Sequence, residues 1–148
     1  MEENKISRVT SLLYDCTNDE VQVIISQTED PEVLYMYAYN YNWDNGFEIP
    51  QSILDHNKCN LSIALLIFYR ADGASYLLNK SYSERLPQWS SFIKKLYETI
   101  IDEKYQKAEI EFKAPLSKVE LYKLKKILSE QENIFIENIE GKNLDIDL

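Results

Sequence analysis

Asp55, His56 and Cys59 are the residues whose types and spacing could support nucleophilic chemistry. A cysteine nucleophile needs a general base that the fold brings within hydrogen-bond reach. His56 is the only histidine of the chain, and it follows the end of a short predicted helix, with Cys59 in the turn beyond it. We interpret Cys59 as a small apolar side chain and His56 as a surface residue. The sequence therefore predicts no catalytic residue, and we expect the protein not to be an enzyme.

Asp44 and Glu48 form a second pair of interest, because paired carboxylates can perform acid–base chemistry. They flank Gly46 and Phe47 in a predicted turn. We favour a local role, in which Asp44 caps the turn and Glu48 contacts backbone amides of the next helix. The alternative is an enzyme or small-ligand binder, with a pocket between helical hairpins where Asp44, Glu48 and His56 converge.

No pattern indicates a cofactor or a metal ion. One His and the distant Cys16 and Cys59 cannot form a structural zinc site, and no acidic loop has calcium-binding spacing. Phosphate-binding glycine loops and the serine elbow are absent as well. The two cysteines form no paired framework. We expect no cofactor, no metal and no disulfide.

The net charge of −9 lies mainly in the first two-thirds of the chain. Residues 1–105 hold 16 acidic and 9 basic side chains, whereas residues 106–148 hold 9 and 7. This balance argues against nucleic acid and anionic membranes, and it favours a basic protein partner. No signal region and no apolar run near about 18 residues occurs. We expect a soluble, cytoplasmic protein.

The pattern of caps and apolar residues predicts a series of helices. Residues 6–13 have helical spacing, and Thr17 with Glu20 forms a capping box for a second helix. The triplet beginning at Asp30 has an N-cap, a proline and an acid, and it opens a helix to about Tyr41. Proline also leads a short helix to about His56 and the long, apolar-striped helix at 87–101, whereas residues 74–86 are predicted as a loop.

An internal repeat decides the fold class. A shift of 30 residues aligns Asp30 with Asn60 and Tyr39 with Tyr69. The tyrosines of residues 35–43 alternate as in a strand, but the second copy is an unbroken apolar helix behind an Asn cap, so we interpret both copies as helical. The repeat predicts a mainly α fold of stacked helical hairpins, solenoid-like in arrangement.

The last third of the chain has a different pattern. Ile110 and Phe112 alternate with charged residues, which indicates a short strand, and Ser117 with Glu120 forms a capping box for a helix past Leu128. Apolar residues at 134–148 indicate further edge strands. We therefore predict one α+β domain over residues 1–148, with a helical body at 1–105 and a small C-terminal β-α-β appendage at 106–148.

Aromatic residues beside acids are the candidate binding residues. Trp and Tyr dominate interface hot spots, and rings within an acidic rim suit a partner that presents Arg or Lys. At least half of the rings must belong to the core, because one helix cannot hide tyrosines on opposite faces alone. The predicted partner-binding residues are Tyr37, Tyr41, Trp43, Asp44, Phe47 and Glu48.

The segments NYNWDNGFEIP at 40–50 and ALLIFYRADG at 64–73, with Cys59 between them, resemble an uncharacterised family of bacterial domains of unknown function. Members read similarly to NYNWDDGFEIP…NPxCDLGTALxLFYxADG, often with a segment like LSKVELYKLKK, here residues 116–126. The likeness covers about residues 30–140. Asn45 stands where a second acid is usual, and Asn-Leu-Ser at 60–62 replaces Asp-Leu-Gly; both changes are conservative for caps and turns.

The resemblance implies a domain of the kind found beside bacterial polymorphic-toxin systems, where small acidic cytoplasmic proteins neutralise a toxin. It implies no catalytic residues. The leading hypothesis is therefore a non-catalytic protein-interaction domain, specifically an immunity-type inhibitor of a basic bacterial toxin domain. A third hypothesis is a homodimeric scaffold whose rings lie in its own interface, so we expect a monomer or a homodimer.

Overall fold

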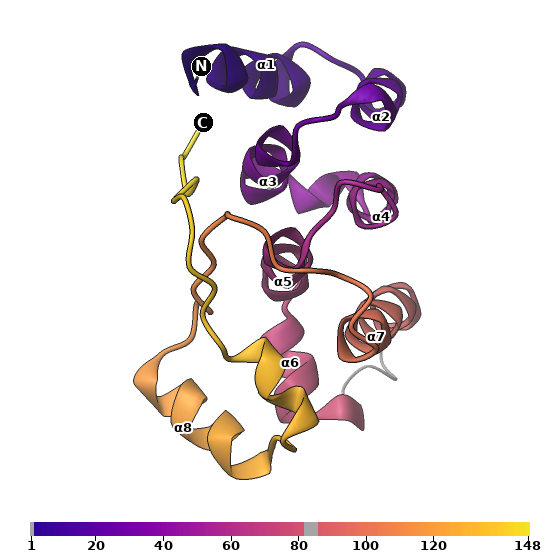
Figure 1. The fold of residues 1–148 in the computed structure, drawn as a ribbon. Coiled ribbons are helices and arrows are strands. Elements are labelled where there is room, and N and C mark those ends of the chain that lie inside the picture. Colours follow the sequence, from indigo (N-terminus) through magenta and orange to yellow (C-terminus); the bar gives the residue numbers. More distant parts are fainter. Residues whose placement is uncertain (1, 82–85) are drawn as a thin grey trace.

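The chain folds into helices that stack as successive pairs (Figure 1). The computed structural model describes residues 2–81 and 86–148, and these contain eight α-helices and the 3-10 turns η1 and η3. The elements are α1 (Glu2–Tyr14), α2 (Asn18–Gln27), α3 (Pro31–Asn40), η1 (Trp43–Asn45), α4 (Glu48–Leu54), α5 (Leu61–Arg70), α6 (Gly73–Leu78), α7 (Pro87–Ile101), α8 (Lys118–Ile127) and η3 (Gln131–Phe135).

Side-chain caps begin the helices where the sequence predicts them. The Thr17 hydroxyl accepts a hydrogen bond from the Glu20 amide, and the Glu20 carboxylate accepts one from the Thr17 amide. Asp30 caps α3 through the Glu32 amide at 2.9 Å, and Asn60 caps α5 at 3.1 Å. Each cap satisfies an amide that has no partner within the helix. The helix starts predicted at Thr17, Asp30 and Asn60 are confirmed, whereas the short helix predicted to open at Pro50 begins at Glu48.

The 30-residue repeat is visible in the helix bounds. α3 and α5 have 10 residues each, and they begin and end at positions 30 residues apart. α3 packs against both α1 and α5, α2 packs against α4, and α5 packs against α7. Figure 1 shows the two resulting columns, with α1, α3 and α5 in one and α2, α4 and α7 in the other. This arrangement agrees with a mainly helical fold of stacked hairpins.

The middle helices α3 and α5 form the centre of the core. Residues 33–38 of α3 and 61–68 of α5 are all buried. A helix that is apolar on every side lies inside a protein, between neighbours that cover all of its faces. This burial explains why the tyrosine alternation in α3 coexists with a helix: Tyr35 and Tyr37 point in different directions, and both meet packed neighbours.

The predicted C-terminal β-α-β appendage is not supported. α8 is present, but in the described residues the expected strands are reduced to two isolated bridges, Ile110 with Lys142 and Phe112 with Ile139. Ile110 and Phe112 are each 3% exposed, because their side chains pack into the core that the helices form. Burial against the helical stack, together with backbone hydrogen bonds between residues 109–112 and 139–142, determines the path of this segment.

The C-terminal tail also lies against the helical stack (Figure 1). The Tyr14 hydroxyl donates to the Leu148 carbonyl at 2.7 Å, and the Asn40 side chain donates to the Ile146 carbonyl at 2.9 Å. Leu144 is buried in the same core cluster as the helices. Residues 106–148 therefore complete the core of the helical stack and do not form a separate layer.

The segment predicted as a loop at 74–86 contains a helix in its first part. α6 begins at Gly73, and Tyr76 and Leu77 are buried against the core. Residues 82–85 of this prediction lie outside the described residues. In the parts of the chain that are described, none of the helices is both long enough and apolar enough to cross a membrane.

Candidate functional site

The turn between α3 and α4 is built to hold one shape. The Asn42 side chain caps η1 by accepting the Asp44 amide at 3.0 Å. Gly46 closes the turn with a φ of 91°, a conformation that side chains rarely adopt. The Tyr41 hydroxyl donates a 2.7 Å hydrogen bond to the Gly46 carbonyl. The turn predicted from the sequence is confirmed, but the side chain that caps it is Asn42 and not Asp44. The bond from Tyr41 fixes the turn to the end of α3.

A chain of aromatic rings runs from the core to this turn. Ring centroids are 5.9 Å apart for Tyr37 and Tyr41, 5.3 Å for Tyr41 and Trp43, and 6.0 Å for Trp43 and Phe47. Phe92 of α7 lies 4.8 Å from Phe47 and closes the cluster. These spacings are typical of favourable aromatic pairs. The cluster fixes Trp43 and Phe47 against the body of the protein.

The predicted binding residues separate into a buried and an accessible group. Tyr37 is 4% exposed and Tyr41 7% exposed. Their rings pack between the turn and the core, and they offer almost no surface to a partner. Burial, followed by the nearby Glu48 carboxylate, raises the pKa of Tyr41 to about 12. Trp43 and Phe47 are half-buried.

Asp44 and Glu48 are exposed on either side of these two rings. We call Trp43, Asp44, Phe47 and Glu48 the acidic–aromatic turn. Of the six predicted partner-binding residues, these four are the accessible ones, and they offer a partner two rings and two carboxylates.

Trp43 has an unusual polar atom. Its indole nitrogen is buried and has no hydrogen-bond partner among the described residues. A buried donor without an acceptor lowers stability by about 1–3 kcal/mol. The packing of the Trp43 ring is therefore favourable, whereas the position of its N–H is not.

Two shallow hollows lie beside the acidic–aromatic turn, and Phe47, Glu48 and Ser91 line both of them. One, of about 490 Å³, continues along α4 and α7 to Asp55 and Lys95. The other, of about 660 Å³, extends to the start of α7. Neither is lined by Asp44 or His56, so these hollows do not bring together the three residues of the ligand-binding alternative.

His56 and Cys59 have local structural roles. The His56 Nδ1 accepts a 2.9 Å hydrogen bond from the Lys58 amide, which closes the turn after α4. The Cys59 thiol donates to the Asn60 carbonyl at 3.7 Å. Burial, and then the charge of Asp55, raises the pKa of the Cys59 thiol. A nucleophilic cysteine needs the opposite shift. In residues 2–81 and 86–148, no group of three His, Cys, Asp or Glu side chains could hold a metal ion.

Sequence reasoning missed the contribution of α7 to this site. Phe92, Ser91 and Lys95 all approach the turn from that helix. The apolar stripe of α7 predicts that Phe92 is buried, but it does not indicate which element covers it. The contact arises because α5 packs on α7 and places it beside α4.

Comparison with known proteins supports an uncharacterised family for the middle of the chain. Residues 29–101 match the model of a family described as Domain of unknown function (DUF4274). The match begins beside the Asp30 cap and ends with the last residue of α7, so it includes the acidic–aromatic turn and Phe92. No curated protein and no solved structure matches the chain.

Proposed function

We propose that this chain is a non-catalytic protein-interaction domain that binds a basic protein partner through the acidic–aromatic turn. The observation that carries the proposal is the pair of half-buried rings, Trp43 and Phe47, held on a tied turn beside exposed Asp44 and Glu48. A guanidinium or ammonium group can stack on such rings while it pairs with the carboxylates. Preorganisation of the turn reduces the entropy lost on binding.

The distribution of charge supports a basic partner. Residues 9–57 contain nine Asp and Glu and no Lys or Arg. Two of the nine, Asp30 and Glu32, pair with Lys5 at 3.1 and 2.9 Å. The other seven are exposed, and they create a negative potential that steers a cationic surface toward this part of the molecule. They are Asp15, Asp19, Glu20, Glu29, Asp44, Glu48 and Asp55.

In its specific form, the proposal is an immunity-type inhibitor that acts in the bacterial cytoplasm and masks a basic toxin domain. Two observations support this form: the acidic surface, and the resemblance of residues 40–73 to domains found beside polymorphic-toxin systems. An inhibitor of this kind acts by stoichiometric binding and requires no catalytic group.

Affinity capture with a charge-reversed bait tests the proposal. The wild-type chain should retain a basic protein from lysate of its host, and the double variant Asp44→Lys, Glu48→Lys should lose that protein. Retention should also fall as salt is raised, because the attraction is electrostatic. A double variant that retains the same protein at the same level would refute the role of the acidic–aromatic turn.

A matched control separates the turn from net charge. Glu137→Lys with Glu140→Lys changes the charge by the same amount at two exposed positions outside the turn. This control should bind the partner as the wild type does. Equal loss of binding in both double variants would show that overall acidity, and not the turn, determines recognition. Circular dichroism and thermal melting establish that all variants are folded.

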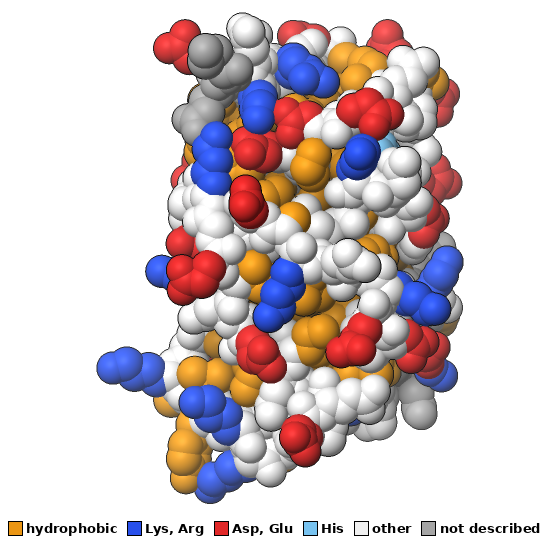
Figure 2. All heavy atoms as spheres, in the orientation of Figure 1, with side chains coloured by type: hydrophobic (Ala, Val, Ile, Leu, Met, Phe, Trp, Pro, Cys, Tyr) orange, Lys and Arg blue, Asp and Glu red, His pale blue; other side chains and the backbone are white. Residues whose placement is uncertain are grey.

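A second candidate function is self-association, and α8 is the observation that favours it. Three apolar residues of this helix are more than half exposed: Val119 at 62%, Tyr122 at 61% and Ile127 at 54%. Lysines are interspersed among them, and Lys126 lies 4.3 Å from the Tyr122 ring. Figure 2 shows lysines gathered over α8, at the opposite end of the stack from α1 and α2. This basic surface is complementary to the acidic one on another copy.

Sedimentation velocity at about 5 and 200 µM distinguishes the two functions. A monomer at both concentrations excludes self-association and leaves binding of a different, basic protein as the proposed function. Concentration-dependent oligomers that dissociate in high salt support self-association through a head-to-tail contact between unlike surfaces of two copies. Lys118→Glu with Lys126→Glu should then prevent this association.

A further inference from the structure

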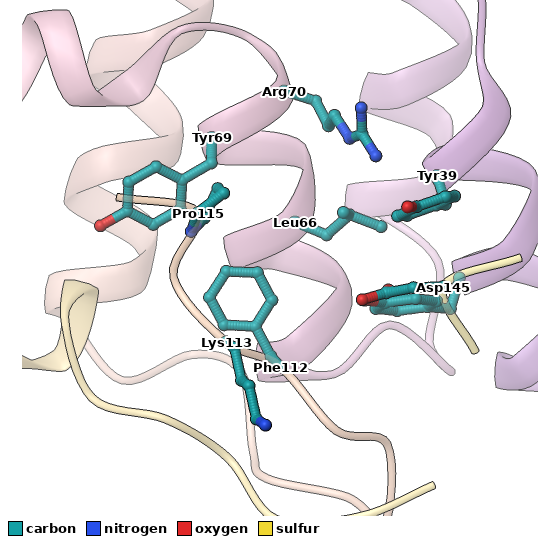
Figure 3. A pocket seen from close by; sticks show the side chains of 9 residues that line it. Tyr39, Leu66, Tyr69, Arg70, Phe112, Lys113, Pro115 and Asp145 are labelled. Carbon is teal, nitrogen blue, oxygen red and sulfur yellow. The ribbon is translucent and has the colours of Figure 1, made fainter. Parts of the chain in front are cut away.

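A concave site lies on another part of the molecule, between α3, α5 and two C-terminal segments (Figure 3). Its volume is about 500 Å³, within the range of small-molecule pockets. Among the residues that line it are Tyr39, Tyr69, Arg70, Phe112, Lys113 and Asp145. None of them belongs to the acidic–aromatic turn, so this site is independent of the function proposed above.

Arg70 is held in place, yet its hydrogen-bond donors are free. The guanidinium carbon lies 4.3 Å from the centroid of the Tyr39 ring, and Figure 3 shows Arg70 reaching toward that ring at the edge of the pocket. Among the described residues, the side chain of Arg70 donates no hydrogen bond and forms no ion pair. A planar guanidinium with free donors binds a carboxylate or a phosphate through two parallel hydrogen bonds.

The charges of the pocket favour an anion. Arg70 and Lys113 contribute two positive charges, and Asp145 contributes one negative charge. The Asp145 carboxylate already accepts a 2.7 Å hydrogen bond from the Tyr35 hydroxyl. The site is thus positive on balance, although the chain as a whole carries −9. Such a local reversal of sign attracts anions to this pocket and away from the rest of the surface.

The floor of the pocket is aromatic. The rings of Tyr69 and Phe112 are 6.0 Å apart and inclined by only 20°. The Tyr69 hydroxyl donates to the Phe135 carbonyl, which fixes the ring. Two nearly parallel rings of fixed orientation suit contact with a flat ring of a ligand.

We propose that this pocket binds a small organic anion, in which a carboxylate or a phosphate is attached to a flat ring. Arg70 binds the anionic group, Lys113 adds to the attraction, and Tyr69 with Phe112 contacts the ring. The carboxylate and phosphate versions share this chemistry and differ only in the size and charge of the group at Arg70.

Titration of the whole chain with two pairs of probes tests the proposal. The anions are benzoate and phenyl phosphate, and their uncharged counterparts are benzyl alcohol and phenol. In ¹H–¹⁵N spectra, at least one anion should produce saturable shifts of the amides near positions 39, 70 and 113. The affinity for its uncharged counterpart should be at least about tenfold lower. Tighter binding of one anion identifies the carboxylate or the phosphate version. If neither anion saturates by about 10 mM, the proposal is refuted.

Substitutions then locate the bound group. Arg70→Gln should weaken binding of the anion about tenfold, and Arg70→Lys should weaken it less, because the charge remains but the two-pronged geometry is lost. Arg8→Gln on α1 is the matched control and should leave the affinity unchanged. If Arg70→Gln does not fold, Arg70→Lys carries the test. Wild-type affinity in a folded Arg70→Gln variant would overturn the assignment.

Asp145→Asn tests the sign of the ligand. Asparagine can still accept the Tyr35 hydroxyl, so the tail should keep its place. Loss of the negative charge should strengthen anion binding about threefold. Weaker binding of the anion would show that the Asp145 carboxylate does not oppose it and would overturn this placement of the anionic group.

Discussion

The Tyr35 hydroxyl donates a 2.7 Å hydrogen bond to the Asp145 carboxylate, across 110 positions of sequence. Nearby, the Asn40 side chain both donates to the Ile146 carbonyl and accepts from the Leu148 amide. Two residues of α3 therefore hold the C-terminal tail against the helical stack. The tail is part of the packing around the central helix, and it also forms one wall of the pocket in Figure 3.

Removal of this hydrogen bond should destabilise the fold measurably. Tyr35→Phe keeps the ring and removes the hydroxyl, so the free energy of unfolding should fall by about 1–2 kcal/mol. Urea denaturation followed by circular dichroism measures the change. Tyr39→Phe is the matched control, because the Tyr39 hydroxyl donates no hydrogen bond among the described residues; it should change stability by less than about 0.5 kcal/mol. Equal losses would show that the bond to Asp145 contributes nothing.

Asn60 combines a helix cap with an unsatisfied donor. Its Oδ1 accepts the Ile63 amide at 3.1 Å, whereas its buried Nδ2 has no partner in the described part of the chain. Asn60→Ala should lower the free energy of unfolding by about 1 kcal/mol through loss of the cap. Asn60→Ser keeps an acceptor and removes the unpaired donor, so it should cost less than about 0.5 kcal/mol. Thermal and urea unfolding would contradict this account if serine proved as harmful as alanine.

Local signals account for the parts of the fold that the sequence predicts correctly. The caps at Asp30 and Asn60, the box at Thr17 and the proline that leads α7 each act within one helical turn. Their effect does not depend on distant partners, and a helical stack places consecutive elements side by side. The repeat could therefore be recognised, and the stacking followed from it.

Long-range packing accounts for the parts that could not be predicted. Ile110 and Phe112 have strand-like alternation, but no adjacent segment offers a continuous edge, and their side chains fill the core instead. The candidate site shows the same limit. Trp43 and Phe47 follow from the turn signal, whereas Phe92 arrives from α7. In the separate pocket at Arg70, Asp145 arrives from the tail. Nothing local in the sequence indicates either contact.

Gly46 in the turn and Gly73 at the start of α6 should respond differently to alanine. At Gly73, a Cβ would lie 2.6 Å from the Phe68 carbonyl oxygen and overlap the Phe68 ring. Gly73→Ala should therefore lower the free energy of unfolding by about 2–4 kcal/mol. At Gly46, a Cβ would meet no atom within 4 Å, and only the φ of 91° opposes it. Gly46→Ala should cost about 1 kcal/mol. Similar urea midpoints for the two variants would refute the steric argument at Gly73.

Trp43→Phe should separate binding from stability. The variant keeps an aromatic ring against Tyr41 and Phe47 but removes the buried N–H that has no partner among the described residues. The smaller ring and the lost donor have opposite effects, so stability should change by less than about 1 kcal/mol. Affinity for the captured partner should fall about tenfold, because Trp is the strongest of the ring residues at interfaces. Unchanged affinity in a titration of the folded variant would remove Trp43 from the site.

Glu132 should make the fold sensitive to acid. Burial alone would raise its pKa, but hydrogen bonds from Lys80, Tyr97 and the Ser129 amide lower the pKa to about 2, from 4.5 in an unperturbed carboxyl. Because the folded pKa is the lower one, ionised Glu132 stabilises the fold above about pH 4.5, and this contribution is lost as the pH falls toward 2.

Glu132→Gln should be less stable than the wild type at pH 7, and the difference should shrink steadily below about pH 4.5. Other carboxylates titrate in both proteins and cancel in that difference. Urea denaturation across this range measures it, and a constant difference down to about pH 2.5 would show that Glu132 does not carry the low pKa.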